Sequence, residues 1–190
     1  MKAEMIHQGE AHIPTDEVHS LVALSKQKIQ HFDKIFDLYF LPIYNYTLSK
    51  VGDRQTAEDI VSQTFLAAME GLPRYQEKGS FSAWIFTIAR SKINDHFRKR
   101  KNISDKGLVE FPDPMDDISF QHIQNEELKA LRRKIQKLPK KKRELIRLRF
   151  VAELSFKEIS EVLGKSESAV KKAIYRTMDA LKDELENDHA

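Results

Sequence analysis

The side chains best suited to chemistry in this sequence are cations and hydrogen-bond donors close to its C-terminal end. They return at helical spacing between residues 167 and 176. The opposite face is apolar, with Val170, Ile174 and Met178. A helix with one buried stripe and one face of hydroxyl, ammonium and guanidinium groups suits the DNA major groove, which is about wide enough to admit it. The candidate recognition residues are Glu167, Ser168, Lys171, Lys172, Tyr175 and Arg176.

Neighbouring helices must position this face. The pattern of residues 138–185 predicts two short helices joined by a tight turn. Ser155 stands three residues before Glu158, so the hydroxyl and the carboxylate can each satisfy a free backbone N–H at a helix start. Gly164 is expected to end this helix, because glycine best tolerates the left-handed conformation there. Ser166 can cap the helix that follows. The segment is therefore predicted to be a helix-turn-helix.

Positive charge is concentrated around this predicted helix-turn-helix. From Lys129 to Lys182 the sequence has 17 Lys and Arg against 6 Asp and Glu, a net charge of +11, whereas the whole chain nets +3. Such a patch matches the phosphate backbone of a nucleic acid, since each neutralised phosphate releases counterions. The alternative is a plain αα-hairpin whose basic face is only solvated. The charge excess favours DNA binding.

The first half of the chain shows the helical period and no strand pattern. Apolar residues at helical spacing begin near Lys26, and Pro42 is expected to end or kink the first helix near Leu41. Start and stop signals predict three further helices, over residues 43–51, 55–71 and 81–101.

The helix predicted over residues 81–101 has two apolar faces. One contains Phe81 and Trp84 and must pack in a core. The other contains Phe86, Ile93 and Phe97, which either pack as well or present rings that stack on unpaired bases. Cations on the same helix could follow a nucleic-acid backbone: Arg90, Lys92, Arg98, Lys99, Arg100 and Lys101.

Composition divides the chain into segments. Its 190 residues with 41% hydrophobic content allow one medium domain or two small ones. Residues 104–126 are acidic and contain two prolines, so they are expected to be a linker. Residues 1–25 are expected to be a mobile tail, in which three histidines share no helical face and predict no metal site. The predicted fold is all-α, with two small helical domains, 26–103 and 127–190, joined by an acidic flexible linker.

Two absences narrow the class of protein. The sequence has no cysteine, which excludes disulfides and thiolate zinc sites. It also lacks an apolar run long enough for a signal peptide or a membrane span. A cytoplasmic protein without membrane insertion and without a cofactor is expected.

Taken in order, these segments resemble a bacterial RNA polymerase sigma factor of the compact extracytoplasmic-function (ECF) class. AEDIVSQTF resembles the family's helix that binds the polymerase clamp, and FSAWIFTIARSKINDHFRKRK resembles its promoter-melting helix. LPKKKRELIRLRFVAELSFKEISEVLGKSESAVKKAIYRTMDALK resembles the domain that binds the upstream promoter element. The resemblance implies promoter-specific transcription initiation, with core RNA polymerase, through its clamp helices and flap, and promoter DNA as partners. It also allows an anti-sigma factor as a partner.

The resemblance also implies roles for particular residues. The recognition residues of the helix-turn-helix would bind the −35 element. The loop of residues 75–80 would receive a base flipped out of the −10 element, at a cost of a few kcal/mol that a pocket can offset. The residues expected to bind and melt the −10 element are Tyr75, Gln76, Lys78, Ser80, Arg90, Asn94 and Arg98. Those expected to bind polymerase are Asp59, Ser62 and Gln63.

Two other functions compete with this one. A free-standing helix-turn-helix regulator would explain only the second half, and a receiver domain in the first half would need alternating strands. A nucleic-acid-processing enzyme would need carboxylates that converge in one pocket, and the adjacent Glu58 and Asp59 have no evident partner. The chain is therefore not expected to be an enzyme. Co-elution with core RNA polymerase and promoter-specific initiation would separate the three functions.

Overall fold

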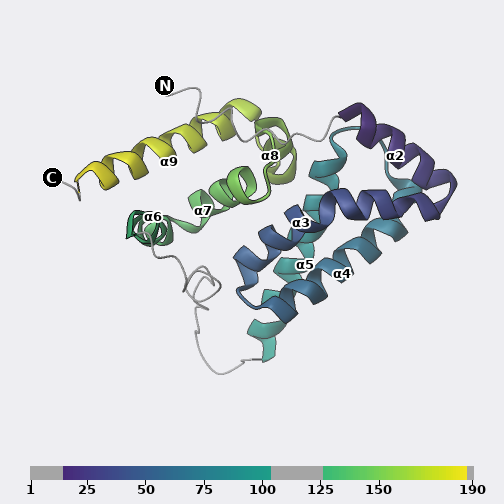
Figure 1. Cartoon of the computed structure of the whole chain (residues 1–190), viewed down its shortest axis with the longest axis horizontal. Helices are drawn as coiled ribbons and strands as arrows, with labels where there is room; N and C mark the ends of the chain where they lie inside the picture. The colour runs from purple at the N-terminus through teal and green to yellow at the C-terminus, as the bar shows by residue number, and fades with distance from the viewer. Residues whose placement is uncertain (1–14, 104–125, 188–190) are drawn as a thin grey trace.

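The computed structural model describes residues 15–103 and 126–187, which form two helical units (Figure 1). The first unit contains α2 (Thr15–Gln27), η1 (Ile29–His31), α3 (Phe32–Val51), α4 (Arg54–Gly71), η2 (Leu72–Arg74) and α5 (Phe81–Ile103). The second unit contains α6 (Glu126–Lys137), α7 (Lys140–Ile146), the π-helical turn η4 (Arg147–Val151), α8 (Phe156–Leu163) and α9 (Glu167–Asn187). No strand occurs in these two ranges, which confirms the predicted all-α fold. The predicted linker lies outside the described residues, except for the residue that begins α6.

Aromatic side chains fill the core of the first unit, where α3, α4 and α5 pack together. Tyr39, Tyr46, Phe81 and Phe86 are all buried, with exposures of 2% or less. Phe86 meets Tyr46 edge-on with ring centroids 5.7 Å apart, and Phe81 meets Tyr39 in the same way at 5.5 Å. This arrangement brings the positive edge of one ring to the negative face of the other. The core thereby fixes α3 relative to α5.

Pro42 does not end the first helix, which was one of the two outcomes expected for it, so the prediction of a separate helix over residues 43–51 is wrong. A single helix, α3, runs from Phe32 to Val51 with Pro42 inside it. Proline removes its own N–H from the helical hydrogen bonds, which normally weakens a helix at that point. Tyr39 and Ile43 lie on either side of Pro42 and are buried, and we infer that their packing outweighs the missing hydrogen bond.

The last part of the predicted N-terminal tail is a helix in the structure. Residues 15–27 form α2, whose Val18 and Val22 are 5% and 0% exposed. These residues are four apart, which places them on one face of a helix, and α2 packs with this face toward α3 and η2. The tail prediction missed this short apolar face. Residues 1–14 lie outside the described part of the chain.

The helix-turn-helix forms as predicted. The Glu158 N–H donates to Ser155 Oγ at 3.2 Å, and the Ser155 N–H donates to the Glu158 carboxylate at 2.8 Å, so both halves of the capping box are made. Gly164 has a φ of 61° and ends α8. The Ala169 N–H donates to Ser166 Oγ at 3.3 Å at the start of α9. Local hydrogen bonds therefore fix both helix ends at the turn.

The two units pack against each other along α3 and α5 (Figure 1). α8 lies on α5, and η4 lies on α3. The buried apolar residues form one cluster that includes Tyr46 and Ile93 of the first unit with Leu148 and Ile159 of the second. All four of these side chains are 0% exposed. The structure thus shows a closed arrangement, and this contact has no counterpart among the sequence-based predictions.

Candidate nucleic-acid interface

α9 presents the predicted recognition residues on one side of the helix. Val170 and Ile174 are 1% and 0% exposed, and their burial fixes the rotation of α9. Tyr175 is half-buried, and the other predicted members are exposed: Glu167, Ser168, Lys171, Lys172 and Arg176. The structure therefore brings all six together on the N-terminal half of one helix.

The ring of Phe156, at the start of α8, lies close to two of these residues, Tyr175 and Lys171. Its ring centroid lies 5.9 Å from that of Tyr175 and 5.8 Å from Lys171 Nζ. Arg149 Cζ lies 4.9 Å from the same centroid. Cations are attracted to the negative face of an aromatic ring. Phe156 thus connects η4, α8 and α9 beneath the recognition residues.

Tyr75 differs from the other predicted residues of the loop 75–80 because it is only 7% exposed. Its ring centroid lies 4.8 Å from that of Trp84 and 5.4 Å from that of Phe81. Lys26 of α2 donates from Nζ to the Tyr75 carbonyl at 2.7 Å. Tyr75 therefore anchors the loop to the first unit. The exposed predicted residues of the loop are Gln76 and Lys78.

Ser80 ends this loop and is held by the second unit. Its backbone N–H donates to Glu161 Oε2 and its hydroxyl donates to Glu158 Oε1, both at 2.8 Å. A Cβ added at Gly79 would lie 2.6 Å from Glu161 Oε2, so the end of the Glu161 side chain lies close to the backbone of this loop. Two carboxylates of α8 therefore cover the end of the predicted −10 loop.

The Glu158 side chain is buried, and it accepts hydrogen bonds from residues of both units. Burial by itself would raise its pKa, but hydrogen bonds from the backbone and hydroxyl of Ser155 and from the hydroxyls of Ser82 and Ser80 outweigh burial and lower that pKa. Ser82 Oγ also lies 2.9 Å from the Tyr39 hydroxyl oxygen. Burial raises the pKa of Tyr39, so this phenol stays neutral. The Glu158 carboxylate is thus ionised at neutral pH and accepts hydrogen bonds from both units.

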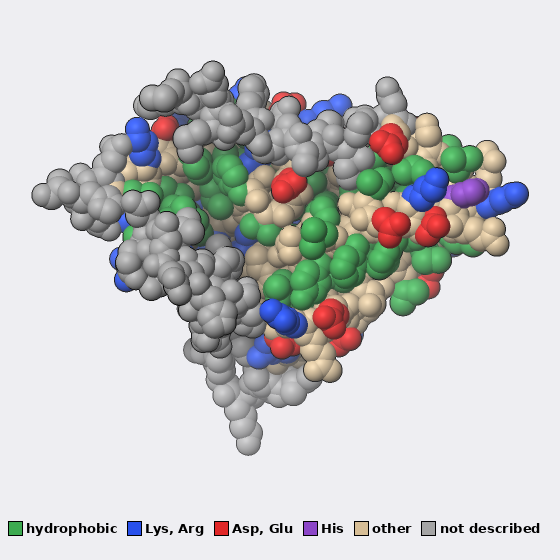
Figure 2. Space-filling view, in the orientation of Figure 1, with side chains coloured by type: hydrophobic (Ala, Val, Ile, Leu, Met, Phe, Trp, Pro, Cys, Tyr) green, Lys and Arg blue, Asp and Glu red, His purple; other side chains and the backbone are tan. Residues whose placement is uncertain are grey.

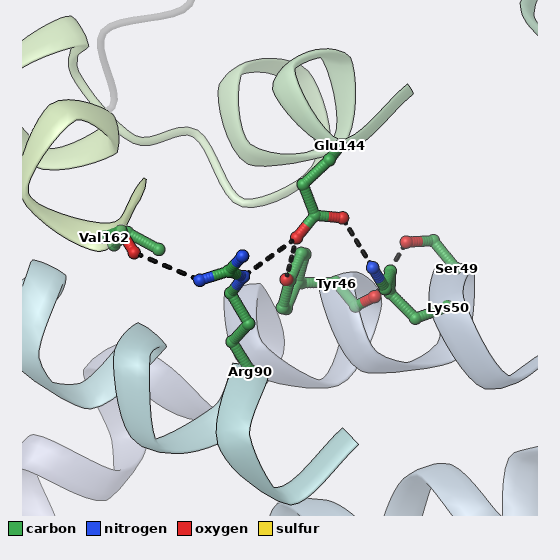
Figure 3. A network of polar contacts seen from close by, with 6 residues as sticks. All are labelled: Tyr46, Ser49, Lys50, Arg90, Glu144 and Val162. Carbon is green, nitrogen blue, oxygen red and sulfur yellow. Dashed lines mark hydrogen bonds and ion pairs between the residues drawn. The ribbon is translucent and has the colours of Figure 1, made fainter. Parts of the chain in front are cut away.

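Arg90 is the other predicted −10 residue that contacts the second unit (Figure 3). Its Nε lies 3.6 Å from Glu144 Oε1, and its Nη1 donates to the Val162 carbonyl at 3.4 Å. The same carboxylate accepts a hydrogen bond from the Tyr46 hydroxyl at 2.8 Å and pairs with Lys50 Nζ at 2.6 Å. Three side chains of α3 and α5 therefore converge on one carboxylate of α7.

The remaining predicted −10 residues lie on α5 and are exposed. Asn94 has an exposed side chain, and Arg98 Nη2 lies 3.0 Å from Asp95 Oδ1. The second apolar face of α5 packs in the core, since Phe86 and Ile93 are 0% exposed. Of the two alternatives for this face, packing holds for these two residues, and they are not available to stack on bases.

The predicted polymerase residues lie on an exposed face of α4. Asp59, Ser62 and Gln63 are all exposed, and at the same helical spacing this face continues into apolar residues. Figure 2 shows a stripe of hydrophobic side chains over α3 and α4. A contiguous exposed apolar patch of this kind commonly marks an interaction site. Its exposed members include Phe36, Phe40, Leu66 and Met69, which are 36% to 60% exposed.

Tyr46, Lys50 and Glu144 are not among the site residues predicted from the sequence. One signal could have marked Glu144, because it is the only acidic residue between Lys129 and Arg149, within a strongly basic run. Tyr46 and Lys50 lie four residues apart on one face of α3, but nothing local connects them to a carboxylate 98 residues from Tyr46.

Two further observations concern residues 15–103 and 126–187. No helix in these ranges is long and apolar enough to cross a bilayer. The same ranges hold no group of three or more His, Cys, Asp or Glu that could bind a metal ion.

Comparison with known families identifies both units. The Sigma-70 region 2 family matches residues 35–103, which contain nearly all of α3, α4 and α5. The Sigma-70 region 4 family matches residues 128–181, which contain most of α6 to α9. A free-standing helix-turn-helix regulator would leave the first of these matches without an explanation.

Individual relatives point to the same class. The chain is 32% identical over 166 residues to the ECF RNA polymerase sigma factor BldN of Streptomyces coelicolor, a match that covers 83% of this chain and 61% of BldN. It is 30% identical over 169 residues to the ECF RNA polymerase sigma factor SigW of Bacillus subtilis, covering 81% of this chain and 88% of SigW. The chain belongs to the ECF RNA polymerase sigma factor family. It is a sigma factor that directs promoter-specific transcription.

Solved structures share the fold. CnrH, in complex with the cytosolic domain of CnrY, has a TM-score of 0.63 at 24% identity, covering 88% of this chain and 96% of that chain. The sigma factor RpoE of Bartonella quintana, in complex with the anti-sigma factor NepR, has a TM-score of 0.62 at 22% identity, covering 82% and 96%. At these identities the likeness concerns the fold alone.

Proposed function

We propose that the two units divide promoter recognition between them. The second unit reads the −35 element through α9, and the first unit binds and helps to open the −10 element through the loop 75–80 and α5. In this proposal the first unit begins with α2 rather than at Lys26, because α2 contributes buried residues to it. The protein acts in the cytoplasm as a specificity subunit of RNA polymerase and catalyses no reaction itself.

One observation carries this proposal, namely the exposed face of α9. Lys171, Lys172 and Arg176 are exposed there, while Val170 and Ile174 are buried on the opposite side. A helix with this division can enter a major groove without losing its own core contacts. The cations then meet phosphates and base edges, which are the acceptors that ammonium and guanidinium groups favour.

The surfaces proposed for polymerase lie on both units. Asp59, Ser62 and Gln63 on α4, with the neighbouring apolar stripe, are proposed to contact the clamp helices, and the second unit is proposed to contact the flap. Charged and apolar groups side by side are typical of a specific protein interface, with a polar rim around an apolar centre. An anti-sigma factor is proposed as a further partner, because such factors often hold members of this family inactive.

Reversal of one charge tests the polymerase surface. Asp59→Lys should weaken binding to core RNA polymerase by about tenfold, which corresponds to about 1.4 kcal/mol. It should leave the fold intact, because an exposed helix substitution normally changes the free energy of unfolding by well under about 1 kcal/mol. Glu17→Lys on α2, which is also exposed and lies outside the region 2 match, is the control. Pull-down with core polymerase and circular dichroism measure both quantities. Equal polymerase affinity for the two variants would exclude Asp59 from the contact.

The wider proposal is tested by transcription. The purified chain added to core polymerase should confer initiation at defined start sites on a promoter library, and polymerase alone should not. A chain that co-elutes with polymerase but confers no promoter preference would contradict the proposed division of recognition.

A further inference from the structure

A group of donors in the first unit binds an anion that comes from the second unit. The Tyr46 hydroxyl and Arg90 Nε approach Glu144 Oε1 at 2.8 and 3.6 Å, and Lys50 Nζ approaches Oε2 at 2.6 Å (Figure 3). The Glu144 side chain is only 11% exposed in this position. All three donors belong to α3 and α5, so the backbone of the first unit brings them to one side of that unit.

Packing in the core holds one of these donors, the Tyr46 hydroxyl, in place. Tyr46 is 0% exposed, and its ring packs edge-on against Phe86. Burial, and then the nearby Glu144 carboxylate, raise the pKa of Tyr46 well above its ordinary value, so the phenol keeps its proton and donates it. Lys50 lies one helical turn further along α3, and Arg90 faces both from α5. In the closed chain these three donors lie around one position.

The chemistry of the site is not specific to a carboxylate. A phenol, an ammonium and a guanidinium around one position form charge-assisted hydrogen bonds with a phosphate as well as with a carboxylate. If Glu144 moved away, two neighbouring cations and a buried hydroxyl would lose their common acceptor. Two cations and a hydroxyl that converge on one position favour an anion there.

We propose that Tyr46, Lys50 and Arg90 form a phosphate-binding site of the first unit, which takes a backbone phosphate of promoter DNA. In the closed chain Glu144 occupies this site in place of the phosphate. The proposal rests on the function proposed above, because it assumes that α5 faces the −10 DNA. It adds two residues to that face, Tyr46 and Lys50, which neither the sequence nor the comparisons assign.

The contacts of Ser80 also support the proposal that carboxylates of the second unit lie where DNA phosphates would bind. Ser80, which is also expected to meet the −10 element, donates its N–H to Glu161 and its hydroxyl to Glu158. Ser80 and Arg90 are ten residues apart, or about 15 Å along α5. Carboxylates of the second unit therefore contact both ends of this stretch, where an anionic strand would lie. DNA and the second unit cannot occupy these positions together.

The test measures single-stranded DNA binding by the full chain, with a fluorescent oligonucleotide of mixed sequence as the probe. A phosphate contact carries no sequence information, so the natural promoter is not required. Glu144→Gln should raise the affinity by about tenfold, because it removes the competing charge. Adding Lys50→Gln to that variant should cancel the gain and reduce the slope of log affinity against log salt by about one unit. Adding Tyr46→Phe should cancel part of the gain with no change in slope.

Matched controls separate this site from general charge effects. Lys34→Gln, an exposed lysine on the same helix, should leave the gain in place when added to Glu144→Gln. If Lys50→Gln has no more effect than Lys34→Gln, the phosphate site is wrong. Arg98→Gln, on the exposed part of α5, reports on the proposed function. If Arg98→Gln weakens binding and Lys50→Gln does not, the proposed function stands without the new site. If neither does, the DNA-binding role of this face fails.

A second comparison covers the case in which Glu144→Gln does not fold cooperatively in circular dichroism. In the complex with core polymerase, Lys50→Arg should retain promoter DNA against rising salt as the wild type does, and Lys50→Gln should release it at lower salt. Equal retention by Lys50→Arg and Lys50→Gln would overturn the proposal, because only a charge-dependent contact separates these two variants.

Discussion

The side chains expected to meet DNA are in opposite states in the two units. On α9 the basic members of the recognition face, Lys171, Lys172 and Arg176, are exposed. In the first unit Ser80 and Arg90 are bound by residues of the second unit, and Tyr75 is buried. The proposed −35 surface is thus available in this closed arrangement, whereas the proposed −10 surface is partly occupied.

This difference separates the two recognition events in energetic terms. In the proposed function, binding of α9 at −35 requires no change between the units. The proposed binding at −10 requires that Glu144, Glu158 and Glu161 leave Arg90 and Ser80, so the cost of opening should lower its apparent affinity. Core polymerase could offset that cost by binding the open arrangement better than the closed one. The free chain should accordingly bind −35 DNA better than −10 DNA.

The largest effect is expected from the shared core. Phe86→Ala removes a fully buried ring that packs against Tyr46, and should lower the free energy of unfolding by about 3–5 kcal/mol. Because the apolar cluster joins both units, the second unit should lose stability as well. Urea unfolding followed by Trp84 fluorescence and by far-ultraviolet circular dichroism measures this, since Trp84 is the only tryptophan and lies in the first unit.

The control is an aromatic residue outside the core. Phe150 in η4 is 44% exposed, so Phe150→Ala should change the free energy of unfolding by about 0.5 kcal/mol or less. Coincident transitions from the two probes would support a single cooperative structure. Separate transitions, with only the first destabilised by Phe86→Ala, would show that the two units are energetically independent.

A smaller effect is expected on the recognition face of α9. Lys171→Ala or Lys172→Ala should cost about 1–3 kcal/mol of affinity, mostly on the preferred −35 sequence, because these residues lie near the helix start and are proposed to read bases. Arg176→Ala should weaken all sequences alike and reduce the salt slope by about one unit, because Arg176 is proposed to contact the DNA backbone. Affinities for a panel of −35 duplexes at several salt concentrations measure both.

The same assay examines the contrast between the units. Glu144→Gln should leave −35 affinity unchanged, since α9 is exposed in the closed chain. A large gain in −35 affinity for Glu144→Gln would show that the closed arrangement restrains α9 too. If none of the three α9 variants altered affinity or salt slope, α9 would not be the groove-reading helix.

Local sequence signals predicted the second unit better than the first. Ser155, Glu158 and Gly164 determine the ends of α8 through hydrogen bonds and backbone conformation within a few residues, so the sequence contains the whole cause. Pro42 misled the prediction for α3, because its cost depends on packing that a local pattern does not contain. The buried side of α9 was also predictable, because its apolar residues repeat at helical spacing.

Contacts between distant segments account for the rest of the candidate site. The Tyr46–Glu144 hydrogen bond joins residues 98 apart, and the Ser80–Glu161 hydrogen bond joins residues 81 apart. The periodicity of a sequence predicts local structure and cannot predict a contact between two residues so far apart. The exposed face of α4 was predictable because its polar residues repeat at helical spacing, whereas the burial of Tyr75 depends on Trp84, Phe81 and a lysine of α2.

The smallest predicted effect concerns pH and the carboxylate that both units share. Hydrogen bonds outweigh burial and lower the pKa of Glu158 in the folded chain, so the folded state holds the charged form more strongly than the unfolded state does. The resulting stabilisation is fully present above the ordinary value of 4.5 and is lost as the pH falls through the lower pKa of the folded state. Glu158→Gln should therefore be less stable than the wild type at pH 7, by about 1 kcal/mol, and the difference should shrink below pH 4.5. Urea unfolding of both proteins between pH 7 and pH 3 measures this difference. A difference that stayed constant across that range would mean that the charge of Glu158 does not contribute, and that its role at the junction is one of shape alone.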